Sequence, residues 1–209
     1  MKYSYFEGIV DSDLPLPELR QRPDTDVASL AIAAGVLDES LDVAFRHEWR
    51  DVSDQLQLYV GYAEEGWMLE FAGVGFMVDP GLKRIVYSPD PGMAASTVRH
   101  LVLDQVLPRV LGHAGALVLH ASAVQLETGV VVVLVGKSGD GKSTLAAAAA
   151  ASGARLIADD CVLLRARDGD DGDDGDIDCV SNYCGLRLFP DSLAALDVPL
   201  EATSTFAGS

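Results

Sequence analysis

The chain has 209 residues, of which 49% are apolar, so it can form one large domain or two small ones, and its composition argues against global disorder. The formal net charge of −17 argues against nucleic acid and against a membrane as partners, because both present negative charge. A polyanionic ligand would therefore have to bind at a local site, together with a metal counter-ion.

Cysteine usage and the first residues bear on the compartment. Cys161, Cys179 and Cys184 are not spaced as metal ligands, and their odd number suggests reduced thiols. Residues 1–7 lack the apolar stretch of a secretion signal, and no apolar run approaches the roughly 18 to 20 residues that a membrane-spanning helix needs. The sequence therefore predicts a cytoplasmic protein.

The first 112 residues have the pattern of a small β-rich module. Residues 56–62 and 67–78 are rich in β-forming types and are predicted as strands joined by a turn at 64–66, and residues 84–87 as a further short strand. This part contains no arrangement of catalytic residues. We expect it to pack on the second half or to present something to it.

This module is predicted to end in a helix over residues 95–111. Its apolar residues recur at intervals of three and four and so share one face, formed by Val98, Leu101, Val102, Val106, Leu107 and Val110. Pro108 is expected to kink or shorten the end of the helix, and Gly112 and Gly115 to stop it. The boundary between the predicted domains, 1–112 and 113–209, lies at this point.

From residue 116 the pattern changes to that of an α/β domain. Residues 116–120 and 130–135 are continuous apolar runs, which predict strands buried on both faces. An Ala-rich helix over 144–152 is followed by Gly153 and by a third strand at 155–158. Strand, glycine-rich loop, helix and strand together predict a P-loop nucleotide-binding βαβ core, preceded by the small β-rich domain.

An acidic run follows at residues 168–178, where seven of eleven residues are Asp. No register in it matches a calcium-binding loop, because no Asp-x-Asp-x-Asp-Gly start has a Glu at the twelfth place. The repeated glycines and like charges instead predict a solvated hairpin tip or linker.

Residues 136–143 match the pattern Gly-x-x-x-x-Gly-Lys-Ser of a phosphate-binding loop, with a predicted strand before it and a helix after it. Glycines let successive backbone N–H groups turn toward phosphate oxygens, while Lys142 approaches the β- and γ-phosphates and the Ser143 hydroxyl can bind Mg²⁺. We expect Mg-ATP as the ligand, contacted by Gly136, Lys137, Ser138, Gly139, Asp140, Gly141, Lys142, Ser143 and Thr144.

Two carboxylates, Asp159 and Asp160, end the strand predicted after the loop helix. If that strand is parallel and adjacent to the strand before the loop, both carboxylates lie beside the phosphates. One can then hold Mg²⁺ and the other can accept the proton of an attacking hydroxyl; the sequence does not distinguish them. His120 ends an earlier predicted strand, and its type alone is compatible with a structural or a functional role.

Residues 119–164, about a quarter of the chain, resemble the catalytic domain of bacterial HPr serine kinase/phosphorylase. The resemblance rests on His120, on the loop 136–143, and on residues 153–160, which read Gly-Ala-Arg-Leu-Ile-Ala-Asp-Asp. With its different N-terminal part, the chain is most similar to the stand-alone HPr-kinase-like proteins.

The resemblance implies an ATP- and Mg²⁺-dependent kinase that phosphorylates a serine of a protein or peptide. It implies that Lys142 and Ser143 bind phosphate and Mg²⁺, that Asp159 and Asp160 share the metal and base roles, and that His120 lies near the transferred phosphate. It is compatible with a homo-oligomer. The chain departs from the family in having Thr144 where a Glu is usual and in ending early, which suggests a C-terminally truncated or shortened relative.

Two alternatives stay open. A small-metabolite kinase also carries an Asp near the end of the strand after the loop helix, although its phosphate loop usually lies near the start of the chain. A non-catalytic ATP-binding module is favoured by Thr144 and by the short C-terminal part. An ABC-type motor is disfavoured, because the chain contains no Leu-Ser-Gly-Gly-Gln sequence.

Overall fold

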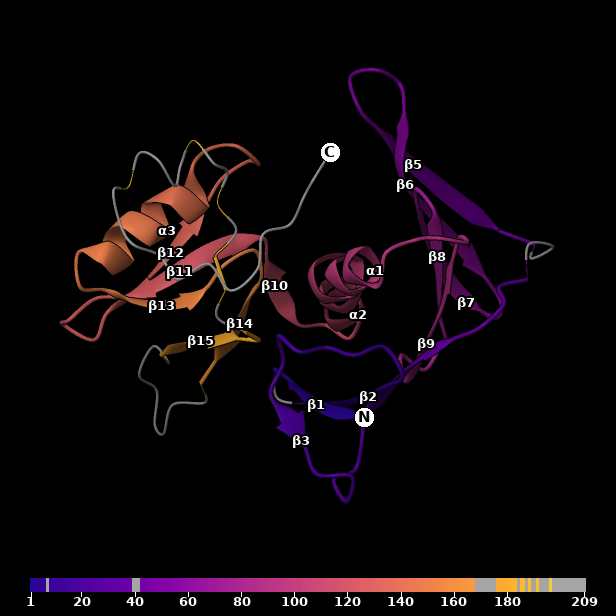
Figure 1. Ribbon diagram of the computed structural model, residues 1–209, viewed down its shortest axis with the longest axis horizontal. Helices are drawn as coiled ribbons and strands as arrows, with labels where there is room; N and C mark the ends of the chain where they lie inside the picture. The colour runs from indigo at the N-terminus through magenta and orange to yellow at the C-terminus, as the bar shows by residue number, and fades with distance from the viewer. Residues whose placement is uncertain are drawn as a thin grey trace.

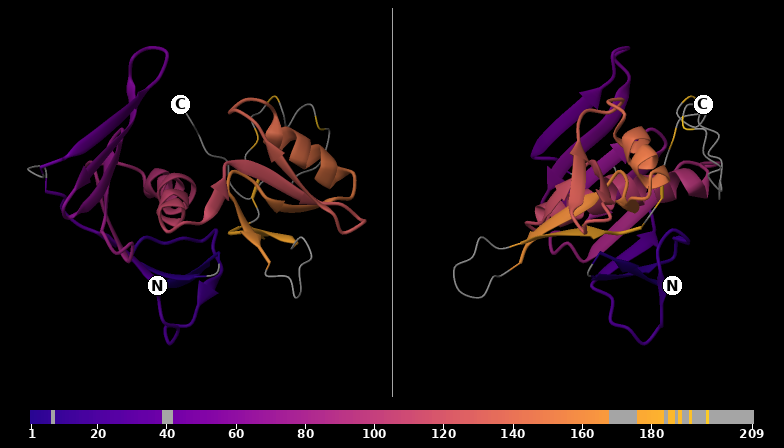
Figure 2. Two further views of the ribbon diagram at one scale, coloured as in Figure 1. Left: turned by 180° about the vertical axis from the view of Figure 1, so that it is seen from behind. Right: turned by 90° about the vertical axis from the view of Figure 1, so that its left-hand side faces the viewer.

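The computed structural model describes residues 1–6, 8–38, 42–167 and 176–183, together with residues 185, 186, 188, 191 and 196. Figure 1 shows a large curved sheet that wraps around a helical segment, and a smaller lobe made of short strands and one helix. The views in Figure 2 agree that the helical segment lies between the large sheet and the smaller lobe.

The large sheet has nine described strands in the order β3-β1-β2-β4-β9-β8-β7-β6-β5. Neighbours pair antiparallel, except that β2–β4 and β4–β9 are parallel. The strands are β1 (Lys2–Tyr5), β2 (Gly8–Ser12), β3 (Gln21–Arg22), β4 (Leu30–Ala34), β5 (Phe45–Arg50), β6 (Leu56–Ala63), β7 (Gly66–Phe71), β8 (Val74–Val78) and β9 (Arg84–Pro89).

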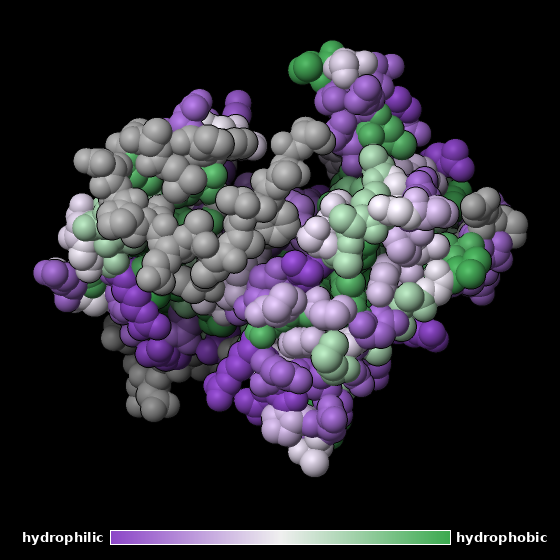
Figure 3. Space-filling view, viewed as in Figure 1, coloured by the Kyte–Doolittle hydropathy of each residue, from purple (hydrophilic) through white to green (hydrophobic). Residues whose placement is uncertain are grey.

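The strands predicted at 56–62 and 84–87 are confirmed as β6 and β9. The predicted stretch 67–78 contains two strands, β7 and β8, because the chain turns at Gly73, whose φ is +81°. The five strands β1 to β5 add to the β-rich character expected of this half. β5 and β6 extend as a hairpin beyond the rest of the sheet (Figure 1), and hydrophobic surface is visible at its tip (Figure 3). Val52, between the two strands, is fully exposed.

The helical segment runs without a break from residue 95 to residue 113 as α1 (Ala95–Leu101), a π-helical stretch η1 (Val102–Val106) and α2 (Leu107–His113). Pro108 lies in the first turn of α2, so the expectation that it shortens the helix is wrong. Proline lacks an N–H, and its ring crowds the carbonyl four residues earlier. The wider π turn just before Pro108 relieves this crowding and lets the helix continue. Gly112 lies inside α2, so the expectation that it stops the helix is wrong; the helix ends at His113, before Gly115, whose φ is +90°.

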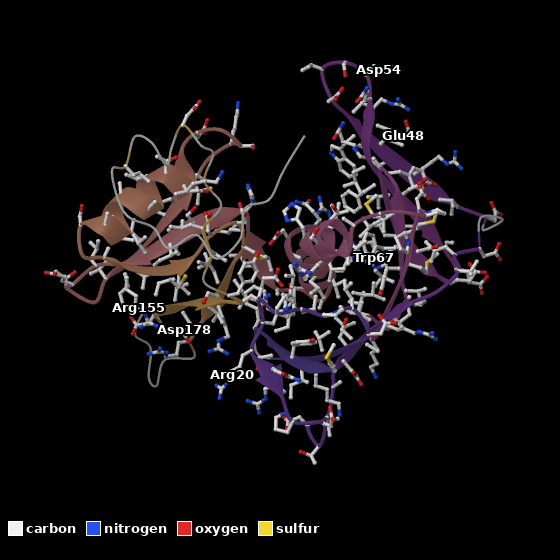
Figure 4. The ribbon with its side chains drawn as sticks, viewed as in Figure 1. Arg20, Glu48, Asp54, Trp67, Arg155 and Asp178 are labelled. Atoms are coloured by element: carbon white, nitrogen blue, oxygen red, sulfur yellow. The ribbon has the colours of Figure 1, made fainter. Side chains whose placement is uncertain are left out.

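The main hydrophobic core lies between the concave face of the large sheet and the helices (Figure 1). The predicted apolar face of the helix is confirmed, since Val98, Val102, Val106, Leu107 and Val110 are all buried in this core. Trp67 of β7 belongs to the same core (Figure 4), and its ring centroid is 4.5 Å from that of His113 at the end of α2. Each such buried side chain contributes about 1.5–3 kcal/mol to the hydrophobic free energy of folding.

The smaller lobe contains two three-stranded sheets, in the orders β10-β14-β15 and β12-β11-β13, and one helix. A small core dominated by alanine, with Ala121, Ala123, Ala158 and Val162 at its centre, joins the two sheets. The elements are β10 (Leu117–Leu119), β11 (Ala121–Gln125), β12 (Val131–Val135), α3 (Lys142–Ala151), β13 (Arg155–Ala158), β14 (Val162–Ala166) and β15 (Ile177–Ser181).

Two expectations about these strands need correction. β10 and β12 were expected to be buried on both faces, but each is an edge strand of its described sheet, and Leu117, Val131 and Val135 are exposed. β12 and β13 were expected to be adjacent. They run parallel to each other, but β11 lies between them and pairs antiparallel with both. A continuous apolar run signals hydrophobic character, and it does not say how many layers cover the strand.

The acidic run falls mainly on residues 168–175, which lie outside the described part of the chain. The strands on either side of it, β14 and β15, pair antiparallel, with Ala166 opposite Ile177. Asp178 accepts hydrogen bonds from Arg165 at 2.9 Å and from Arg167 at 2.5 Å (Asp178 is labelled in Figure 4). The run therefore connects the two strands of a hairpin, as one of the two predicted alternatives requires.

Candidate functional site

The predicted phosphate loop, residues 136–143, connects the end of β12 to the start of α3, as the sequence pattern predicts. Gly139 and Gly141 have φ values of +87° and +84°, a region of backbone space that is costly for residues with a Cβ atom. A Cβ atom added to either residue would have nothing within 4 Å. The glycines are thus required by the turn of the backbone rather than by close packing.

Two side chains of the loop form hydrogen bonds with the loop's own backbone. The carboxylate of Asp140 accepts a hydrogen bond from the backbone N–H of Lys137 at 2.7 Å. The ammonium group of Lys142 donates to the carbonyl oxygens of Gly136 and Lys137, at 3.1 and 3.0 Å. Lys142 therefore points back over its own loop, where its three donors can be transferred to phosphate oxygens without a large movement.

Asp159 lies directly beside the loop helix. Asp159 is only 3% exposed. Its Oδ1 atom accepts a hydrogen bond from the hydroxyl of Ser143 at 3.0 Å. The hydroxyl of Ser122 donates to the same oxygen at 2.5 Å. The tertiary structure therefore brings together two predicted residues, Ser143 and Asp159, although β13 is not the neighbour of β12.

Asp160 and His120 form a second pair next to this one. Nδ1 of His120 contacts the carbonyl oxygen of Asp160 at 3.0 Å, and because a carbonyl only accepts, the ring nitrogen must carry the proton. Asp160 has a φ of +66°, which is uncommon for a residue other than glycine but is tolerated by Asp. His120 is exposed and Asp160 is half-buried, so this pair lies at the surface of the site.

Cys161 follows the two carboxylates and lies in the interior, at 5% exposure. Burial, together with the negative charges of Asp104 and Asp160, raises the pKa of its thiol to about 12. The thiol is therefore protonated near neutral pH and is not a reactive thiolate.

Other predicted residues contribute less to the observed geometry. Ser138 is exposed in the loop, and Thr144 is half-buried in the first turn of α3. A cavity of about 330 Å³ adjoins the loop and is lined by Val133, Leu134, Val135, Asp140, Gly141, Lys142 and Leu145. Its walls combine the outer side of β12 with the base of the loop helix.

Ser122 was not identified from the sequence. The available signal was a single hydroxyl residue within the short run Ala-Ser-Ala-Val that follows His120. All four residues of this run are buried in the structure, and a buried hydroxyl needs a hydrogen-bond partner. The partner, Asp159, lies 37 residues further along the chain, so no local pattern could reveal it.

Among the described residues, no cluster of three or more His, Cys, Asp and Glu side chains has the arrangement of a metal site. Mg²⁺ usually keeps several water ligands and takes one or two protein ligands together with phosphate oxygens, so Ser143 and Asp159 fit the needs of a nucleotide-bound ion. No helix in the described part of the chain is long and apolar enough to cross a membrane.

Comparison with known proteins returned no similarity. The chain matches no protein-family model, no curated protein and no solved structure.

Proposed function

We propose that this chain is an ATP-dependent kinase that transfers the γ-phosphate of Mg-ATP to a serine hydroxyl of a protein or peptide. The observation that carries the proposal is the hydrogen bond of 3.0 Å between Ser143, at the start of the loop helix, and the buried carboxylate of Asp159. Phosphate-loop proteins use a hydroxyl at this position and a strand-end carboxylate to hold Mg²⁺ beside the phosphates.

The phosphate-binding role rests on the loop itself. Backbone N–H groups of the loop and of the first turn of α3 can donate to the phosphates, and the helix N-terminus favours the negative charge. Lys142 exchanges its two carbonyl acceptors for oxygens of the β- and γ-phosphates. Mg²⁺, when bound with the nucleotide, neutralises charge that develops between these phosphates.

The structure favours a division of roles between the two carboxylates. Asp159 is buried and bonded to Ser143, which suits a residue on the metal side of the site. Asp160 is half-buried and next to the exposed His120, which suits a residue that meets a macromolecular acceptor. In this assignment Asp160 takes the proton of the acceptor serine while the serine oxygen forms a bond to the γ-phosphorus. The bond between the γ-phosphorus and the β–γ bridging oxygen breaks at the same time, which releases ADP.

His120 is assigned a supporting role near the transferred phosphate. Its Nδ1 proton is held by the carbonyl of Asp160 at 3.0 Å, which fixes the orientation of the ring. In the neutral ring the other nitrogen, Nε2, is then an acceptor.

The proposal is tested by transfer of label from γ-labelled ATP, with Mg²⁺, into a fractionated host lysate. We expect acid-stable label on a protein or peptide with the wild-type chain and none with Lys142→Ala. Lys83→Ala is the matched control, because it removes the same charge from an exposed position just before β9, outside the predicted site, and should label normally. Label confined to the small-molecule fraction would instead establish a metabolite kinase, and binding of ATP without any transfer would establish a non-catalytic module.

A further inference from the structure

Ser122 is a polar residue in the most buried strand of the smaller lobe. It lies on β11, the central strand of its sheet, opposite Leu134 of β12, and its exposure is 0%. Its neighbours Ala121 and Ala123 are also fully buried. An apolar residue would suit such a position better than serine, because a buried hydroxyl costs free energy unless it is hydrogen-bonded. The presence of a hydroxyl here therefore calls for a specific partner.

That partner is Asp159, the carboxylate assigned to the metal side of the site. Ser122 Oγ donates to Asp159 Oδ1 at 2.5 Å. Ser143 Oγ donates to the same oxygen at 3.0 Å. The two serines come from different elements, β11 and α3, so the carboxylate bridges the centre of the sheet and the phosphate-loop helix.

This bridge has a consequence for Ser143. A serine hydroxyl has one proton and two lone pairs, so a proton donated to Asp159 leaves the lone pairs of Ser143 Oγ available to a cation. The direction in which they point depends on where Asp159 Oδ1 is held. Ser122 holds that atom from the sheet side, through the shorter of the two hydrogen bonds.

We propose that Ser122 is a positioning residue of the metal site. It does not touch nucleotide or metal; it fixes the carboxylate of Asp159, which in turn orients the hydroxyl of Ser143 for Mg²⁺. This inference rests on the proposed function, because it concerns the way in which the same site binds Mg-ATP.

The test uses three substitutions at this position. Ser122→Ala removes the hydroxyl, Ser122→Cys keeps nearly the same volume but offers only a weak donor, and Ser122→Thr keeps the hydroxyl. Binding of a fluorescent ATP analogue to the full chain is measured as Mg²⁺ is titrated, and again in EDTA, with thermal unfolding recorded for each variant.

We expect the Mg²⁺ concentration that gives half-maximal enhancement of nucleotide binding to rise about 10- to 100-fold in Ser122→Ala and Ser122→Cys, the range seen when residues behind a metal ligand are removed. Ser122→Thr should stay near the wild-type value. Affinity in EDTA should be the same in all folded variants, because the loop still binds phosphates without the metal.

Three results would overturn the inference. One is an unchanged Mg²⁺ requirement in Ser122→Ala. Another is an equal loss of affinity in Mg²⁺ and in EDTA that follows a loss of thermal stability, which would make Ser122 a packing residue only. The third is a folded Ser122→Thr variant that behaves like Ser122→Ala. A wild-type chain that binds no ATP analogue in Mg²⁺ would refute the proposed function itself, and this outcome is recognised before any variant is made.

Discussion

The hydroxyl of Tyr183, just after β15, donates a hydrogen bond to the buried carboxylate of Asp104, which lies in the π-helical stretch 79 residues earlier in the chain. The side-chain oxygen of the preceding residue, Asn182, accepts a hydrogen bond from the backbone N–H of Phe6 at 3.2 Å. Two adjacent residues that follow β15 therefore bind the π-helical stretch and the residue just after β1 of the large sheet. Contacts of this kind couple the unfolding of the two halves.

Removing the Tyr183 hydroxyl should weaken this coupling. We expect Tyr183→Phe to lower the free energy of unfolding by about 1–3 kcal/mol, because its partner is a buried charged group. Tyr62→Phe is the control, since its hydroxyl contacts His113 at 3.1 Å in an exposed setting and should cost less than about 0.5 kcal/mol. Urea unfolding checks both values, and equal effects of the two substitutions would contradict the role assigned to Tyr183.

Two glycines with different backbone conformations should respond in opposite ways to alanine. Gly141→Ala places a Cβ atom at a φ of +84° and should cost about 1–2 kcal/mol of stability, in addition to disturbing the phosphate loop. Gly112→Ala lies within α2, with open space around the new atom, and should stabilise the chain by about 0.5–1 kcal/mol. Chemical denaturation of the two variants provides the measurement, and a stabilised Gly141→Ala would show that the loop backbone is not as described.

Stability should fall at alkaline pH through Tyr87. Burial and a hydrogen bond to Asp13 at 3.0 Å raise its pKa to about 12, whereas the unfolded value is about 10. Below pH 10 the phenol is protonated in both states. As the pH rises from 10 to 12 the unfolded chain loses this proton first, so the free energy of unfolding drops by up to about 1.4 kcal/mol per pH unit.

Tyr87→Phe removes this titration and should therefore lose less stability than the wild type between pH 9 and pH 11. Urea unfolding at the two pH values measures the difference. Parallel declines in the wild type and the variant would mean that Tyr87 does not contribute to the alkaline transition.

The two carboxylates of the site should separate binding from transfer. Asp159→Asn is expected to reduce Mg²⁺-dependent ATP binding by at least about tenfold, because the neutral amide lacks the negative charge that would stabilise Mg²⁺. Asp160→Asn should leave binding near the wild-type value while phosphate transfer falls by about 10²- to 10⁴-fold, the usual contribution of a general base. Asn also tolerates the φ of +66° at this position. The reverse pattern would exchange the two assignments.

The predicted phosphate loop could be located from the sequence because its pattern consists of consecutive residues. The turn at Gly139 and Gly141 and the helix that begins at Lys142 depend on neighbours in the chain, and these features agree with the expectations. The apolar face of residues 95–111 was predictable for the same reason. The continuation of the helix past Pro108 was not, because the π turn depends on how the segment packs in the core.

The sequence by itself determined the local features of this protein: the loop between β12 and α3, the Asp159–Asp160 pair at a strand end, and the helix that packs on the large sheet. Only the tertiary structure decided that β11 separates β12 from β13, that β12 lies at an edge, and that Ser122 bonds to Asp159. Strand order and burial arise from contacts between residues far apart in the chain. The short-range pattern of a sequence records which surfaces are apolar, but the partner that covers each surface is selected only when the whole chain folds.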